Sequence, residues 1–361
     1  MLRAQREVNS AFTTHIQEDG LLYLTASSLS VPSLAHGFST RLGGVSRGVF
    51  AALNLGLHRG DSTENVQENY RRFCAVLGVA PQRCVLARQV HRDDVKVVTA
   101  QDAGAGLLRP QDYEADALVT NVPGLTLTIF SADCIPTLYF DPVTRCIGAA
   151  HAGWRGTALG IAAKTIAAME RLYGAKAEHI RAAIGPGISR CCFETDADVP
   201  AAMRAALGAE VEPYLQRSAQ DGKWHVDLKA INRHWMLRAG LAPEHIAVSG
   251  ACTACCTDLY WSHRRMGDVR GSQAAMICLK ETPRQRRPRH CEAFHPKGSF
   301  SAAHRRTVPA ACRLLGQRPA GGGKRRSERP PGTGRLRYSR RCGSHHFLCP
   351  SYPGRGNAGP H

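Results

Sequence analysis

Long hydrophobic runs are absent from this chain of 361 residues. No apolar stretch reaches the roughly 18 residues that a membrane-spanning helix needs, so we expect no membrane partner. Residues 1–9 also lack the apolar centre of a secretory signal. We therefore expect a cytoplasmic protein, in which the 14 cysteines are thiols or metal ligands rather than a disulfide framework.

Acidic residues are scarce at one end of the chain only. The whole sequence carries 47 Lys and Arg against 29 Asp and Glu, a net charge of +18. Residues 281–361 hold 18 of these basic residues and 3 of the acidic ones, so residues 1–280 carry a net charge of only +3. Strong positive charge is typical of nucleic-acid binding. Because the charge belongs to the tail, we expect no nucleic-acid partner for residues 1–280.

Residues 281–361 differ in kind from the rest of the chain. They contain 10 of the 20 prolines, many Arg and Gly residues, and no helical or strand period. Such a segment buries too little apolar surface to offset its chain entropy, so we predict disorder. One interpretation is a tail for nucleic acid or another acidic partner. We favour the other interpretation, a segment translated from a shifted reading frame.

Strand and helix patterns alternate along residues 1–280, which we expect to form one domain. Alternating apolar residues predict strands, and cap residues with a closing glycine predict helices. This mixture indicates an α+β or mixed α/β fold. The predicted strands are 21–25, 95–98, 117–120, 125–130, 146–150, 180–184, 246–249 and 274–279, and the predicted helices are 61–77, 157–173 and one within 226–239.

Three residues next to predicted strands carry metal-ligand chemistry. Cys134 and His151 each follow a predicted strand, and His91 precedes one. One thiolate and two imidazoles at strand ends could meet in a cleft and hold a single zinc ion with its fourth position open. That ligand pattern is typical of catalytic rather than structural zinc. Taken singly, each histidine is more often a packing or surface residue, and the cysteine a buried thiol.

A second group of cysteines invites a metal-site interpretation that the spacing disfavours. Cys252 and Cys255 form a Cys-x-x-Cys pair, and Cys191 and Cys192 lie upstream. A four-cysteine zinc site usually takes its ligands from two spaced pairs. Because the upstream pair is adjacent, we expect poor geometry for one tetrahedral ion, and buried thiols instead.

Many motifs of residues 20–280 resemble those of the YfiH-like, laccase-domain family, also called the multicopper polyphenol oxidase family. The motifs are at 36–46, 54–61, 88–91, 115–120, 132–136, 151–156, 183–188, 252–255 and 262–265. The resemblance implies a mixed β-sheet sandwich flanked by helices, with a catalytic domain at 1–280 that binds one zinc ion at His91, Cys134 and His151. It also implies phosphorolysis of adenosine, inosine, guanosine and methylthioadenosine, together with adenosine deamination. The oligomeric state stays open.

Phosphorolysis of a nucleoside needs an anion pocket for phosphate. Arg41 stands in a glycine-rich loop and could offer a bidentate fork to phosphate oxygens. Arg155 precedes the helix predicted at 157–173, where free amides also favour an anion. Asp133, beside Cys134, could orient a ligand histidine or act as an acid or base. Each residue also has a structural interpretation: a loop brace for Arg41, an ion pair for Arg155 and a strand-end cap for Asp133.

Other activities remain open beside the phosphorylase. The family is also associated with copper-dependent oxidation of phenols, which would make Cu²⁺ the alternative ion, and with editing of peptidoglycan precursors. Laccase chemistry uses several coppers and closely spaced histidine pairs, and residues 1–280 contain no His-x-His. A Cys-His hydrolase would use Cys134 as nucleophile and His151 or His91 as base.

One departure from the family pattern lies near the end of the domain. After residues 262–265 the family usually has Thr-Gly-Arg, whereas this chain has Arg270, Gly271 and Ser272. The change removes an arginine from its usual place and puts the closing strand at 274–279 in doubt.

Overall fold

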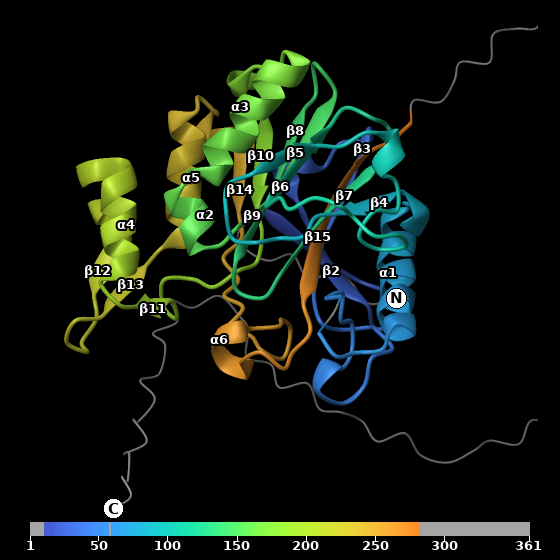
Figure 1. Ribbon diagram of the computed structural model, residues 1–361, viewed down its shortest axis with the longest axis horizontal. Helices are drawn as coiled ribbons and strands as arrows, with labels where there is room; N and C mark the ends of the chain where they lie inside the picture. The colour runs from blue at the N-terminus through green and yellow to red at the C-terminus, as the bar shows by residue number, and fades with distance from the viewer. Residues whose placement is uncertain (1–10, 58, 282–361) are drawn as a thin grey trace, which may run out of the picture. The chain divides into compact units, whose positions relative to one another are not determined.

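Two six-stranded sheets pack face to face in the computed structural model, which describes residues 11–57 and 59–281 (Figure 1). The strands of the first sheet, in spatial order, are β1 (Phe12–Ile16), β2 (Leu22–Ala26), β3 (Leu34–Ser39), β15 (Gln273–Leu279), β7 (Thr126–Ser131) and β4 (Cys84–Leu86). They pair antiparallel, except that β4 is parallel to β7. The predicted closing strand is confirmed as β15, which lies in the middle of this sheet.

The second sheet is mixed as well. Its strands, in spatial order, are β14 (Ile246–Val248), β10 (Arg181–Ile184), β8 (Ile135–Asp141), β9 (Cys146–Ala152), β6 (Ala117–Thr120) and β5 (Val95–Val97). The edge strands β14 and β5 pair parallel to their neighbours, and the inner strands pair antiparallel.

Apolar side chains from both sheets fill the space between them. Phe38 and Leu127 come from the first sheet, and Leu138 and Ile147 come from the second; all are at most 2% exposed. Burial of each such side chain contributes about 1.5–3 kcal/mol. The core therefore confirms the mixed-sheet sandwich.

Helices cover the outer faces of both sheets, as the family resemblance implied. One helix packs on the first sheet and three lie over the second, on the opposite side (Figure 1). The helix on the first sheet is α1 (Thr63–Leu77), and those over the second are α2 (Trp154–Ala158), α3 (Ile161–Tyr173) and α5 (Leu228–Arg238). The other two helices are α4 (Asp198–Leu207) and α6 (His263–Met266). A small sheet beside α4 contains β11 (Glu194–Thr195), β13 (Trp224–Val226) and β12 (Leu215–Arg217).

Helix α1 ends where the cap residues predict. The hydroxyl of Ser62 accepts a hydrogen bond from the backbone N–H of Asn65, and Gly78 closes the helix in the left-handed conformation with φ of 67°. Val66, Tyr70 and Phe73 recur at helical spacing and face the first sheet. The local sequence therefore sets both the ends and the buried face.

The helix predicted at 157–173 is wrong in its extent. The structure has two helices there, α2 and α3, with Gly160 between them at φ of 74°. The left-handed backbone angle favours glycine, whereas a Cβ on Gly160 would make only an ordinary contact with the Trp235 ring at 3.5 Å. The apolar residues keep their helical spacing across residues 159–160, so the sequence pattern did not indicate that the helix is interrupted there.

The chain passes between the two sheets several times. Residues 87–94 lead from β4 in the first sheet to β5 in the second, and residues 121–125 lead from β6 back to β7. Residues 132–134 then lead directly from β7 to β8 in the second sheet. Two of these crossings, 87–94 and 132–134, contain predicted site residues.

Two predictions concern the limits of the described structure. Among the described residues, no helix has the length and apolar character needed to cross a membrane. The predicted domain boundary at 280 comes one residue after Leu279, where the last described strand ends. The predictions for the tail fall on 282–361, which lie outside the described residues.

Candidate active site

The structure brings His91, Cys134 and His151 together. One ligand atom from each lies within 4.8 Å of the others. The two imidazole rings have centroids 4.9 Å apart and are nearly perpendicular, at 83°. A Cβ on Gly153 would come within 2.9 Å of Cδ2 of His91 and 3.3 Å of Sγ of Cys134, so this glycine leaves room for the cluster.

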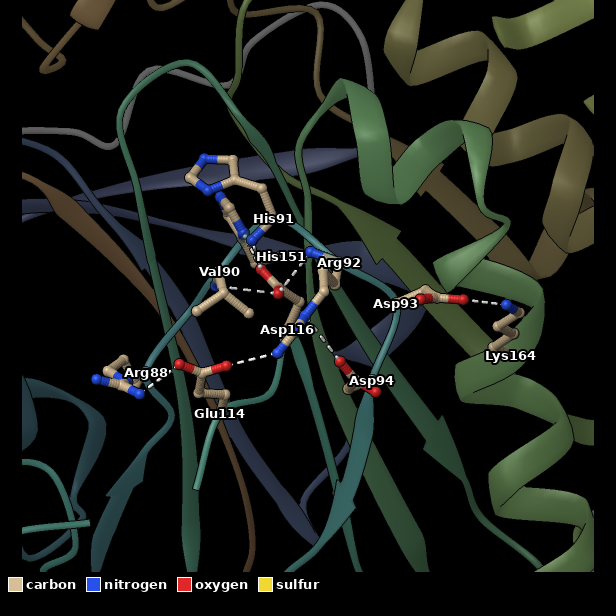
Figure 2. A network of polar contacts seen from close by, with 10 residues as sticks. All are labelled: Arg88, Val90, His91, Arg92, Asp93, Asp94, Glu114, Asp116, His151 and Lys164. Carbon is tan, nitrogen blue, oxygen red and sulfur yellow. Dashed lines mark hydrogen bonds and ion pairs between the residues drawn. The ribbon is translucent and has the colours of Figure 1, made fainter. Parts of the chain in front are cut away.

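Asp116 holds both histidines of the cluster (Figure 2). Its buried carboxylate lies 2.8 Å from Nδ1 of His151 and accepts the backbone N–H groups of Val90, His91 and Arg92 at 2.8–3.1 Å. Since Nδ1 lies against the carboxylate, Nε2 of His151 is the ring nitrogen left for a metal ion, which binds it after its proton has left. Asp116 is therefore a candidate site residue that had no assigned role in the sequence analysis, although it stands in the motif at 115–120.

Exposed ion pairs fix the loop that carries His91. Glu114 accepts hydrogen bonds from Arg88 and Arg92, and Lys164 of α3 pairs with Asp93 (Figure 2). Exposed pairs of this kind each contribute little to stability, about 0–1 kcal/mol. They add to the three backbone hydrogen bonds by which the loop is attached to Asp116.

The cluster favours a thiolate beside a protonated imidazole when only protein groups are present. Burial raises the pKa of Cys134, but the charge of His151 and hydrogen bonds from both imidazoles outweigh it and lower the pKa to about 6. Burial lowers the pKa of His151, yet the Cys134 thiolate and the Asp116 carboxylate raise it to about 9. A thiolate is the form of cysteine that binds metals and attacks electrophiles.

Backbone strain is concentrated at this site. His91 has φ of 62° and Asp133 has φ of 87°. Residues other than glycine rarely adopt a positive φ, and they keep this strained conformation only where surrounding contacts hold them. Both residues lie in the connections that cross from one sheet to the other.

Asp133 is held by its neighbours rather than by a histidine. Its carboxylate accepts hydrogen bonds from Oγ1 of Thr253 at 2.6 Å, Oγ of Ser262 at 3.0 Å and the backbone N–H of Arg264 at 2.7 Å. The histidine-orienting role considered for Asp133 is filled by Asp116 in the structure. Asp133 ties the segment before Cys134 to the loops after β14.

A pocket of about 380 Å³ opens beside the cluster. Its volume lies within the range of small-molecule sites. Arg155, His263, Arg264 and Arg270 contribute to its lining along with the three cluster residues and Asp133. A pocket with this many cationic groups suits an anionic ligand.

Arg270 is a functional candidate that sequence reasoning missed. It is only 6% exposed, and within the described residues its Nε has no hydrogen-bond partner. Its Nη1 donates to the backbone oxygen of Gly271 and to Oγ of Ser272. A buried guanidinium in the wall of a pocket can bind an anion there. Comparison with the family pattern suggested a missing arginine here, but the structure places Arg270 in the pocket.

The two arginines predicted for the anion site differ in position. Arg155 lines the pocket with its guanidinium 4.3 Å from the Trp154 ring centroid. Arg41 donates to the backbone oxygens of Ala51 and Thr257 and stacks over Trp261 at 4.0 Å. Arg41 is not among the residues that line the pocket. The structure thus brings Arg155, but not Arg41, to the cluster.

The donor set of the cluster fits a metal ion. One sulfur and two imidazole nitrogens lie close enough to share a cation, and Asp116 fixes the ring of His151 from behind. Nitrogen and sulfur donors of this kind suit zinc and copper better than magnesium or calcium. Asp133 adds no ligand, because its oxygens are occupied by other donors.

The family model described as multi-copper polyphenol oxidoreductase laccase matches residues 35–280. The chain belongs to this family. A purine nucleoside phosphorylase of Deinococcus radiodurans is 42% identical over 261 residues, which cover 72% of this chain and 94% of the relative. Purine nucleoside phosphorylase YlmD of Geobacillus stearothermophilus is 38% identical over 250 residues, covering 68% of this chain and 90% of the relative.

Two solved structures that are similar to this chain have the same fold. The crystal structure of YlmD from Geobacillus stearothermophilus has a TM-score of 0.69 and 36% identity, and covers 74% of this chain and 99% of that one. YfiH of Bacillus licheniformis also has a TM-score of 0.69, with 33% identity and the same coverage. The predicted fold and family are therefore confirmed.

Proposed function

We propose that this chain is a zinc-dependent purine nucleoside phosphorylase, which cleaves adenosine, inosine or guanosine with phosphate. The observation that carries the proposal is the largely buried guanidinium of Arg270 in the wall of the same pocket that His91, Cys134 and His151 line. The names of the relatives support the same activity.

In this proposal the residues of the pocket have three roles: metal binding, phosphate binding and positioning of a ligand. A zinc ion held by Cys134, His91 and His151 would supply a Lewis acid with an open coordination position. The Arg270 guanidinium would bind phosphate from the wall of the pocket, and Arg155 adds positive charge at the more exposed side. Asp116 keeps His151 in one tautomer, so the ligand geometry is set before substrate arrives.

We further propose that the same site phosphorolyses methylthioadenosine and deaminates adenosine. Deamination needs water rather than phosphate, so the two reactions separate by their phosphate requirement. No disulfide joins the ten cysteines of the described residues, which supports the cytoplasmic location that we propose.

Incubation of the purified protein with adenosine tests these activities. Adenine should form only when phosphate is added, and inosine should form with or without it, each separated by chromatography. Metal analysis of the same sample should find zinc. Absence of phosphate-dependent base release from every purine nucleoside would contradict the phosphorylase proposal.

A Cys-His hydrolase is the second candidate, because the cluster favours a thiolate beside a protonated His151. The two candidates differ in their need for metal. Removal of metal by a chelator should abolish the phosphorylase and restoration of zinc should recover it, whereas a cysteine nucleophile should keep its activity after chelation. A copper oxidase would instead show copper in the metal analysis and oxygen uptake with phenols.

A further inference from the structure

Four cysteines outside the active-site cluster converge on one point. Cys191 and Cys192 lie between β10 and β11, and Cys252 and Cys255 follow β14. All four sulfur atoms lie within 4.8 Å of one another. The adjacent cysteines were expected to have poor geometry for one ion, and this expectation is wrong. The sulfurs of Cys191 and Cys192 lie 3.8 Å apart, and both contact the sulfur of Cys255.

The spacing of the sulfurs matches a tetrahedral site. With a zinc–sulfur distance of about 2.3 Å, tetrahedral sulfurs lie about 3.8 Å apart. Cys255 Sγ lies 3.5 Å from Cys191 Sγ and 3.4 Å from Cys192 Sγ. A disulfide would require about 2.05 Å, and these cysteines are all unpaired. Four sulfur donors without a carboxylate select a thiophilic ion such as zinc.

The surroundings of the four sulfurs suit a negatively charged centre. The backbone N–H of Ser189 donates to Sγ of Cys252 at 3.3 Å, and Nη2 of Arg265 donates to Sγ of Cys192 at 3.6 Å. The buried ammonium of Lys229 donates to Oγ of Ser189 and to the backbone oxygens of Ser249 and Ala251, on the segment that leads to Cys252. Zinc with four thiolates carries a net charge of −2, which these cations balance.

We propose that Cys191, Cys192, Cys252 and Cys255 bind one structural zinc ion, separate from the ion at the active site. The ion fastens two loops that stand beside the active-site pocket. Ile188 and Phe193 from the first loop line that pocket, and Thr253 from the second holds Asp133. Cys191 and Cys255 are exposed, so an ion can reach the four sulfurs from solvent.

Zinc content of the full chain tests the proposal directly. The double variant Cys191→Ser/Cys255→Ser should contain one zinc equivalent less than wild type by inductively coupled plasma mass spectrometry, whatever metal occupies the active site. Cys256→Ser, on the same loop but outside the set, is the matched control and should keep the wild-type content. Unchanged zinc in a folded double variant would overturn the proposal.

A second measurement covers a double variant that does not fold. The variant His151→Ala lacks one active-site ligand but keeps all four cysteines of the second site. X-ray absorption at the zinc edge of this variant should show four sulfur neighbours at about 2.3 Å. A shell of mainly nitrogen and oxygen would overturn the proposal, as would peptide mapping that finds a disulfide among the four cysteines.

Discussion

Asp116 is the residue on which both histidines of the site depend. It contacts the ring of His151 and the backbone of His91, and it is fully buried. Replacement by Asn keeps the shape but removes the charge that holds Nδ1 of His151. Outer-shell changes of this kind typically cost 10–100-fold in metal affinity or activity.

We therefore expect Asp116→Asn to bind zinc about 10–100-fold more weakly than wild type. Competition with a chromophoric chelator measures the affinity. Asp112→Asn, an exposed carboxylate in the same connection, is the control and should behave as wild type. An affinity of Asp116→Asn within twofold of wild type would remove Asp116 from the metal site.

Cys134 supplies the sulfur ligand of the proposed active site. Cys134→Ala should lose the metal of this site and reduce nucleoside phosphorolysis to less than about 1% of wild type, because two imidazoles alone hold zinc weakly. Chromatographic product assays and metal analysis measure the two effects, and circular dichroism verifies the fold. Retention of full turnover would show that the thiol is not needed.

Arg270 and Arg41 are competing candidates for the phosphate contact. Arg270→Gln should raise KM for phosphate at least tenfold, since a charged hydrogen bond contributes about 1.5–3 kcal/mol, and should leave zinc content unchanged. Arg41→Gln tests the sequence prediction in the same assay. A rise in phosphate KM for Arg41→Gln alone would transfer the anion role to Arg41.

Among the elements, strands with clear alternation and helices with clear caps were predictable. α1 and β6 have close to the expected bounds. β8 was not predicted, because every residue from Ile135 to Asp141 is buried and the strand has no alternating pattern. The residues of the metal cluster could be named from sequence and family resemblance, whereas Arg270 required the structure, since a single arginine after a loop carries no pattern.

His36 makes β3 sensitive to acid. Its Nε2 accepts the backbone N–H of Ala26 in β2, and burial lowers its pKa from 6.5 to about 4. The unfolded chain takes up a proton that the folded chain does not, so the free energy of unfolding falls as pH drops from about 6.5 towards 4. This pKa difference corresponds to a total loss of about 3 kcal/mol in the free energy of unfolding.

His36→Gln keeps an acceptor for the Ala26 amide but cannot be protonated. Urea unfolding between pH 7 and pH 4 should show a shallower loss of stability in this variant than in wild type. His179→Gln, which changes a more exposed histidine, should keep the wild-type slope. Identical slopes in His36→Gln and wild type would show that His36 does not titrate on unfolding.

At the scale of the whole molecule, the excess positive charge and the chemistry lie in different parts of the chain. The proposed site is formed by residues 59–272, whereas residues 281–361 carry a net charge of +15. Truncation after Lys280 should therefore leave turnover and KM within twofold of the full chain at equal salt. A tenfold or larger loss of turnover would give the tail a role in catalysis, and steady-state kinetics on both proteins decides the matter.

The two sheet crossings at 87–94 and 132–134 have a mechanical consequence. His91 and Cys134 lie on these crossings, while His151 belongs to the second sheet itself. A cation shared by the three side chains, as proposed above, would clamp the two crossings to that sheet. Sliding of one sheet over the other would then pull the ligands apart, so loss of the ion and shear between the layers should occur as a single event.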